Sequence, residues 1–306
     1  MVNLRYHIVS LVAVFLALAL GVVLGAGPLQ RQINAASEGT NLAEKSSQLE
    51  SQLATVQAEA DQYATFVTDT AEQVLPGSLA DRKVALILLP GANAEVAESV
   101  QATLREAGAT VTGAAQLTDN WVSPGQREYR DTLANPVSSH LAASNQSGAA
   151  DSILAQALVE ALTGTGAEVD LLREILTDVD TPLVVANSMP EAPADQLVLI
   201  TPSTPYPKAG QEEDSQSGSQ PAASEQALTA LAGALADRTE GAVAYGAAVT
   251  DDDVIALLRG QGTSLATVDQ IGTPMGNLNV ALVLANQSRG AFGQGIGATT
   301  AVAPLK

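Results

Sequence analysis

The residues that could bind a soft metal ion are few in this 306-residue sequence, and they are far apart. Cysteine is absent, which excludes thiolate ligands and a cysteine nucleophile. Copper or zinc would need histidine and methionine ligands grouped in space, and pairs three or four residues apart on a helix are the usual sign. No such pair occurs among the candidates, which are His7, His140, Met189 and Met275. We therefore predict no transition-metal site and no cofactor.

Three consecutive carboxylates, Asp251–Asp253, could hold a hard cation such as calcium. They also follow Thr250, a residue type that begins helices, and carboxylates in a first turn complement the positive end of the helix dipole. We favour this helix-capping interpretation because it needs no further ligands.

Phosphate-binding loops are recognised by spaced glycines between a strand and a helix. The turn Leu89–Asn93 stands at such a place but has one glycine and no lysine, so a plain turn is favoured over a nucleotide site. The glycines at 290, 293, 295 and 297 follow a predicted helix, which favours a flexible tail. Serine–histidine–carboxylate catalysis would have to use His140, and no nucleophile-elbow motif is present. The sequence indicates no catalytic residue, and we predict a protein that is not an enzyme.

The overall charge argues against nucleic acid as a partner. The formal net charge is −19 and aromatic residues make up 3% of the chain. A strongly acidic chain repels the phosphate backbone, and few aromatic side chains are left for base stacking.

The N-terminal segment predicts a membrane anchor over residues 8–27, preceded by a short cytoplasmic N-terminus, 1–7. Ile8 to Ala26 is 19 residues without a charge, enough to cross a hydrocarbon core of about 30 Å. A buried core helix and a cleaved signal peptide are the alternatives, but the run has no polar face, and Pro28 is a poor context for cleavage. Because Arg5 precedes the span and acidic residues predominate after it, we expect a single-pass protein of the plasma membrane with an extracytoplasmic C-terminal domain.

A heptad pattern predicts a short coiled coil over residues 31–75. Apolar or small residues recur at the d and a positions, and no proline or glycine interrupts 40–75 before Pro76-Gly77. This apolar stripe needs a partner, either a helix of a second protein or another copy, or else it folds back onto its own chain. We call these partner-binding positions the seam: Leu42, Ser46, Leu49, Leu53, Val56, Ala60, Tyr63, Val67, Thr70 and Val74.

Residues 81–290 predict an extracytoplasmic α/β domain. Val84–Leu89 is an apolar run that ends in Pro90-Gly91, and it is followed by a helical pattern, Gly108 and a second strand from Thr110. This order is typical of a strand–helix–strand unit, and the fully apolar strand indicates a sheet covered on both faces, hence a doubly wound, mostly parallel sheet. Further strands are predicted at 183–186, 197–201, 242–245 and 265–268, and helices at 151–163, 169–179, 225–236, 251–258 and from Pro274.

Three segments do not fit the alternation of strands and helices. Residues 122–148 mix loop residues with short helical pieces, 202–223 are rich in proline, serine and acidic residues, and 291–306 follow the last predicted helix. We interpret 202–223 as a disordered loop and 291–306 as a flexible tail.

Several blocks of the sequence resemble the actinobacterial copper-transporter family, the MctB- and SteB-like envelope proteins. The opening block Leu4–Gly25, LRYHIVSLVAVFLALALGVVLG, is similar to the start of that family. Residues 84–92 with the following helix and 107–113 resemble its first strand–helix–strand unit, and 267–276 with the helix after them resemble its C-terminal block. The tail has Gly290-Ala291-Phe292-Gly293 where relatives carry a Gly-His-Tyr-Gly-like ending.

The resemblance implies two functions of different classes. The family name implies copper homeostasis or efflux across the cell envelope, and the SteB branch implies a coiled-coil partner in cell division or envelope assembly. Because a single span encloses no pore and soft ligands are scarce, we expect any copper role to be indirect or oligomeric.

Overall fold

A computed structural model describes residues 28–142, 146–178, 180–207, 224–238 and 240–305, with side chains described from residue 45 onward. The predicted anchor, 8–27, lies outside the described residues. Within the described part of the chain, no helix is both long and apolar enough to cross a membrane. The chain divides into two compact units, residues 1–63 and 64–306.

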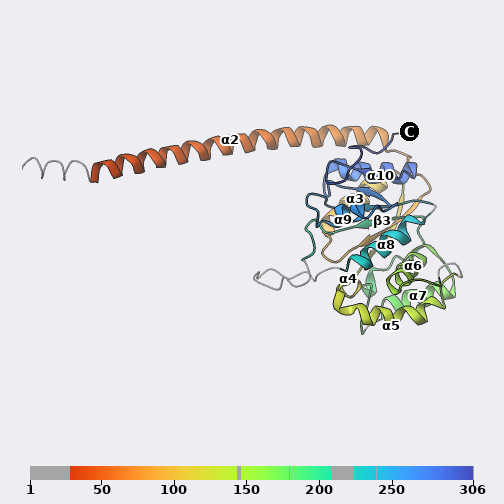
Figure 1. Cartoon of the computed structure of the whole chain (residues 1–306). Helices are drawn as coiled ribbons and strands as arrows, with labels where there is room; N and C mark the ends of the chain where they lie inside the picture. Colours follow the sequence, from red (N-terminus) through yellow and green to blue (C-terminus); the bar gives the residue numbers. More distant parts are fainter. Residues whose placement is uncertain (1–27, 143–145, 179, 208–223, 239, 306) are drawn as a thin grey trace, which may run out of the picture. The chain divides into compact units, whose positions relative to one another are not determined.

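One long helix, α2 (Pro28–Val74), covers the predicted coiled-coil region. Its C-terminal end follows from the sequence: Leu75 still donates its amide to the carbonyl of Ala71, but Pro76 cannot continue the helical ladder and Gly77 has a positive φ of 77°. Figure 1 shows α2 as a single uninterrupted helix.

The described part of unit 64–306 contains one six-stranded parallel sheet with strand order β2-β1-β3-β4-β5-β6. The predicted α/β class with a mostly parallel sheet is confirmed. Two of the central strands, Gln196–Ile200 and Ala242–Tyr245, are buried at every position because both sheet faces are covered. The strands are β1 (Lys83–Leu88), β2 (Thr110–Gln116), β3 (Gln196–Ile200), β4 (Ala242–Tyr245), β5 (Ala266–Val268) and β6 (Ala291–Phe292).

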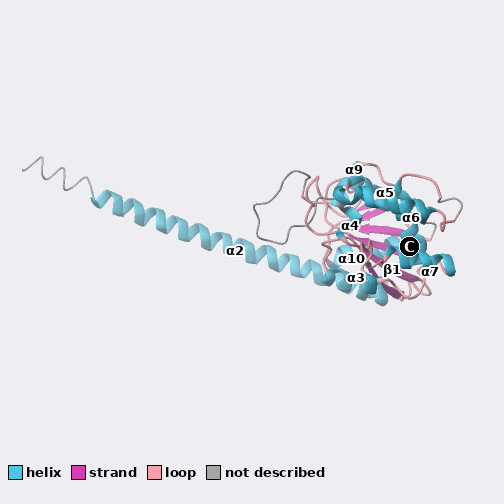
Figure 2. Cartoon of the chain, turned by 90° about the horizontal axis from the view of Figure 1, so that it is seen from below, coloured by secondary structure: helices cyan, strands magenta, loops and turns pink. Residues whose placement is uncertain are grey.

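Helices cover both faces of this sheet (Figures 1 and 2). Successive strand residues alternate between two cores: Ile87 and Leu199 belong to one, and Leu86 and Val198 to the other. Helices α6, α8 and α9 bury side chains in the first core, and α3 and α10 in the second. The helices of the unit are α3 (Ala94–Glu106), α4 (Asp119–Val122), α5 (Arg127–Ser138), α6 (Ala150–Thr163), α7 (Ala167–Leu176), α8 (Glu225–Ala236), α9 (Val254–Gly260) and α10 (Pro274–Asn286), with 3-10 turns η1 (Pro124–Gln126) and η3 (Ala186–Ser188).

Two helices begin at residues whose side chains cap their first turn. The side chain of Asn93 accepts a hydrogen bond from the amide of Glu95 at α3, and that of Thr273 accepts one from Gly276 at α10, where Pro274 takes the first turn. The predicted cap of α9 was wrong: Asp253, not Thr250, is its N-cap residue.

The predicted strand at 183–186 was also wrong. Leu183 and Val184 are fully buried, as the apolar pattern indicated, but Val184 makes only an isolated antiparallel bridge to Leu117. The amides of both residues donate to the carbonyl of Leu176 at the end of α7. Their hydrophobic pattern therefore reflects burial beside the sheet edge without strand pairing.

The last residues of the chain carry structure that the interpretation as a flexible tail missed. Ala291–Phe292 form β6 parallel to β5, and Asn279 of α10 donates to the carbonyl of Ala301 and accepts from the amide of Ala303. The segment 202–223 lies largely outside the described residues. Within 122–148, the 3-10 turn η1 and helix α5 together occupy residues 124–138.

Candidate functional site

The predicted seam is exposed along the first part of α2. Leu49, Leu53 and Val56 are 65%, 64% and 62% exposed, Tyr63 is 47% exposed, and the small residues Ser46 and Ala60 are exposed as well. The side chain of Leu42 lies outside the described residues. Three large aliphatic side chains on one stripe, each left mostly open to water, form a continuous apolar surface on the part of α2 whose side chains are described.

The continuous exposed part of the seam ends at Tyr63, and the remaining seam positions belong to unit 64–306. Val67 is 1% exposed and belongs to the second core, Thr70 is half-buried, and Val74 is 36% exposed. The buried stripe here runs through Val67, Ala71 and Leu75, four residues apart, so it leaves the heptad phase. At Val67 the predicted seam therefore packs on its own domain, whereas Val74 stays exposed.

Sequence reasoning missed one exposed aromatic residue beside the seam. Phe66 is 67% exposed, the most of any large apolar side chain described on α2. It stands at a g position next to Val67, so a search confined to a and d positions passes over it. The sequence could have indicated Phe66 as a contact residue through its large aromatic side chain and its position beside the stripe.

The turn after β1 lies at the point where the strand order reverses, the usual ligand crevice of doubly wound sheets. Here a side chain of the same chain bonds to the turn: the Tyr206 hydroxyl donates to the carbonyl of Pro90 at 2.8 Å, and Tyr206 is 8% exposed. Burial raises the pKa of Tyr206 above its ordinary value. The turn acts as a βα connection capped by Asn93, as the simpler of the two sequence interpretations has it.

The carboxylates at 251–253 have a local structural role at Asp253. Its Oδ2 accepts hydrogen bonds from the amides of Val249 and Thr250 at 2.8 and 2.7 Å, so the buried side chain closes the turn that precedes α9. Asp251 and Asp252 are exposed. Across the described residues, no group of three or more His, Asp or Glu side chains is placed to hold a metal ion.

The remaining candidate soft ligands are not brought together. Met189 packs against the first core and Met275 against the second, so the sheet lies between them. His140 Nδ1 lies 2.7 Å from Glu168 Oε2, an ion pair when the ring is protonated. His7 lies outside the described residues.

A buried charge pair at the carboxyl end of β5 escaped the sequence analysis. Arg259 donates to Asp269 Oδ2 at 2.8 Å, and their side chains are 5% and 3% exposed. Asp269 also accepts from the amides of Gln294 and Gly295, which ties the residues after β6 to β5. A Cβ atom at Gly293 would lie 2.1 Å from Asp269 Oδ1, so this close approach requires glycine. The glycines read as a sign of flexibility thus serve tight packing.

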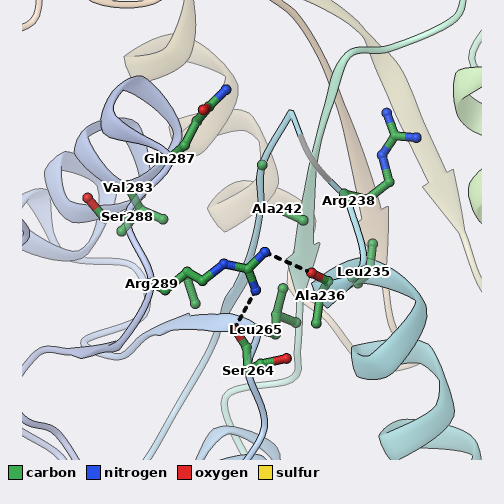
Figure 3. Close-up of a pocket in the computed structure, with 12 residues that line it drawn as sticks. Leu235, Ala236, Arg238, Ala242, Ser264, Leu265, Val283, Gln287, Ser288 and Arg289 are labelled. Atoms are coloured by element: carbon green, nitrogen blue, oxygen red, sulfur yellow. Dashed lines mark hydrogen bonds between the residues drawn. The ribbon is translucent and has the colours of Figure 1, made fainter.

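A pocket of about 250 Å³ lies at the other end of the strands, where β4 and β5 begin (Figure 3). Arg289 donates to the carbonyls of Ser264 and Ala236, both at 3.2 Å, and so places a cation at the C-terminal end of α8. Arg238 donates to the carbonyl of Asp195, and burial lowers its pKa. These guanidinium groups complement carbonyl oxygens.

The comparisons with known proteins identify a family. A family model described as "Copper transport outer membrane protein, MctB" matches residues 1–304. Curated relatives from Mycobacterium bovis and Mycobacterium tuberculosis, each named Copper transporter MctB, are 29% identical to this chain over 137 residues. The alignment spans 44% of this chain and 44% of each relative, less than half the length of either.

Proposed function

We propose, on the premise that this chain belongs to the MctB family whose model matches residues 1–304, that it takes part in copper transport across the cell envelope. Family membership is the observation that carries this proposal. Copper is the cargo in this proposal, and the chain acts without enzymatic chemistry and without a resident cofactor.

The role in copper transport is indirect or oligomeric. A single membrane span cannot enclose a pore, so a transport path would need several copies or a partner protein. The soft ligands of the described residues support the same view, since Met189 and Met275 lie on opposite faces of the sheet. Cu(I) prefers thiolate and thioether ligands gathered at one place.

We further propose that residues 8–27 anchor the chain in the plasma membrane, with the N-terminus in the cytoplasm and the α/β domain outside it. The uncharged run from Ile8 to Ala26 supports this arrangement. A reporter enzyme that is active only outside the cytoplasm, fused after Lys306, is expected to be active. An active cytoplasmic reporter at the same position would contradict the topology.

A second candidate function is that of a coiled-coil partner in cell division or envelope assembly. The exposed stripe of Leu49, Leu53 and Val56 on α2 favours it, because such a stripe is stabilised by a second helix. The two functions share the seam as the contact with a partner.

Deleting the gene separates the two. The copper-transport proposal expects copper sensitivity as the primary defect, and the second candidate expects altered cell shape and septation at ordinary copper levels. Complementation with Leu49→Asp plus Leu53→Asp should fail and partner co-purification should be lost, whereas the outward-facing pair Ser51→Asp plus Thr55→Asp should behave like the original chain. Unchanged co-purification with the first pair would count against a role for the seam.

Copper binding by the purified full chain tests the indirect role. Isothermal titration is expected to show no tight site. A submicromolar dissociation constant for copper would contradict the proposal that the chain does not hold copper itself.

A further inference from the structure

We propose that the partner of the seam is a second copy of this chain, joined in parallel and in register through residues 45–63 of α2. This inference rests on the proposed function, since it names the partner of the same surface. The proposed contact covers the part of α2 where the apolar stripe is exposed, from Ser46 to Tyr63.

The charges that flank the stripe fit a parallel pair of identical helices. With Leu49 at d and Leu53 at a, Lys45 is a g residue and Glu50 is the e residue five positions later. In a parallel coiled coil a g residue faces the e residue five positions later on the other helix. Lys45 therefore faces Glu50 of the partner subunit, and symmetry repeats this attraction on the other side.

The remaining flanking positions bring no like charges together in this arrangement. Gln52 at g faces Gln57 of the partner subunit, and Glu59 faces Ala64 of the partner subunit. Two identical helices with a net acidic surface thus meet along a line where the facing pairs are attractive or neutral.

The antiparallel arrangement is less favourable. A register that stacks Leu49 on Leu53 of the partner subunit places Glu50 beside Glu50 of the partner subunit at the centre of the interface. Facing glutamates repel, whereas the parallel register has no such pair. A membrane anchor before the helix would also hold both copies in the same direction.

The seam is bounded on its C-terminal side by the fold itself. Val67 is 1% exposed in the core of its own domain, so it is not available to another helix. The a positions Ser46 and Ala60 are small and leave Leu49, Leu53, Val56 and Tyr63 as the main contacts. Such a short stripe forms a weak pair in water and gains from the raised effective concentration of a shared membrane.

Single cysteines test this arrangement cleanly because the chain has none of its own. Leu49→Cys and Leu53→Cys are introduced separately into the full-length chain, and membranes are treated with a mild oxidant. Disulfides need Cα atoms within about 7 Å, which matching core positions of a parallel pair satisfy and outward positions do not. Each variant alone should give disulfide-linked dimers, and Ser51→Cys, on the outward face two residues from both, should give about ten-fold fewer.

Other patterns overturn the proposal. A disulfide that forms only when Leu49→Cys and Leu53→Cys chains are mixed would show an antiparallel pair. Equal cross-linking of all three variants, or none in any, would show that the stripe does not join two copies in register.

Charge reversal supplies a second test in the Leu49→Cys background. Lys45→Glu should reduce dimerisation about five-fold, since two weak attractions become repulsions. Adding Glu50→Lys should restore it, because the pair is then reversed and again attractive. A double variant as weak as the single one would contradict the pairing of these residues.

The outcome remains separable from that of the proposed function. If cysteine cross-linking fails while Leu49→Asp plus Leu53→Asp still abolishes complementation of the copper defect, the seam binds a different protein and only self-association is wrong. If cross-linking succeeds and the deletion strain has normal copper tolerance, self-association stands and the copper role is wrong.

Discussion

Residues 45–63 of α2 and the α/β unit differ in which side chains they expose to water and which they bury. In the helix, Leu49 and Leu53 are 65% and 64% exposed, whereas in the α/β unit Arg130 and Asp269 are 1% and 2% exposed. Apolar side chains outside and charged ones inside both run against the usual preference.

The two regions differ in whether the fold itself supplies partners for these unusual side chains. The guanidinium of Arg130 donates through Nε to Asp151 at 2.7 Å and through Nη1 to the carbonyls of Asn120 and Ser123, so most of its burial is offset within the fold, while Nη2 has no hydrogen-bond partner among the described residues. For the leucines of α2, none of the described residues supplies an apolar cover. The α/β unit therefore holds its own stabilising contacts, whereas the stripe on α2 is the surface that the proposed second copy would cover.

The largest expected effect comes from breaking the buried charge pair. Arg259→Met leaves Asp269 charged and buried without its cation, and we expect a loss of about 4 kcal/mol in the free energy of unfolding. Urea denaturation followed by the fluorescence of Trp121, the sole tryptophan and itself buried, measures it. The matched control is Arg82→Met, which removes an exposed pair with Glu240 and should cost less than about 1 kcal/mol. Equal losses in the two variants would contradict the importance of burial.

A smaller effect comes from comparing a buried leucine just past the end of α2 with an exposed leucine on α2. Leu75, just past the end of α2, is 1% exposed, and Leu75→Ala should lower the free energy of unfolding by about 3 kcal/mol because it leaves a cavity in the second core. Leu53→Ala makes the same chemical change on the exposed stripe and should leave Trp121-detected unfolding unchanged to within about 0.5 kcal/mol. A comparable loss for Leu53→Ala would mean that the stripe already packs on its own domain.

The smallest effect concerns a buried hydroxyl group. The Tyr245 hydroxyl accepts from the amide of Gly272 at 2.8 Å and donates to Asn277 Oδ1 at 3.0 Å, so Tyr245→Phe should cost about 2 kcal/mol. Tyr206→Phe, which removes a single bond to Pro90, should cost about 1 kcal/mol. A reversed order would contradict the assigned network.

The same substitution carries a pH dependence. Burial is the main cause that raises the pKa of Tyr245 in the folded chain, while an unfolded tyrosine titrates near about 10. The folded state therefore favours the neutral phenol, and this contribution is complete below about pH 10 and is lost as the pH rises further. Unfolding measured between neutral and alkaline pH should show a smaller alkaline loss in Tyr245→Phe than in the original chain. An identical loss would assign the effect to other groups.

Much of the fold could be predicted from local patterns. The strand at 242–245 and the helix at 225–236 have the predicted bounds, and Pro274 begins the last helix as expected. These elements have strong local signals, an apolar run or a helical repeat with a capping residue. The segment at 183–186 has an equally strong apolar run and is not a strand, because burial and strand pairing produce the same pattern in a short segment.

The candidate site divides in the same way. The heptad spacing predicted the stripe on α2, and the exposed Leu49, Leu53 and Val56 lie on it. The pattern did not reveal that Val67 leaves the stripe for the core, nor that Phe66 stands exposed beside it. Both depend on where the helix meets its domain, which spacing alone does not contain.

The sequence by itself determined most of the helices and strands and which family the chain resembles, because those features rest on residues close together along the chain. Only the tertiary structure decided which apolar side chains are covered, that Tyr206 bonds to the turn after β1, and that Asp269 accepts hydrogen bonds from Gln294 and Gly295. The physical reason is that burial and buried hydrogen bonds depend on contacts between residues far apart in the sequence, and their spacing carries no record of those contacts.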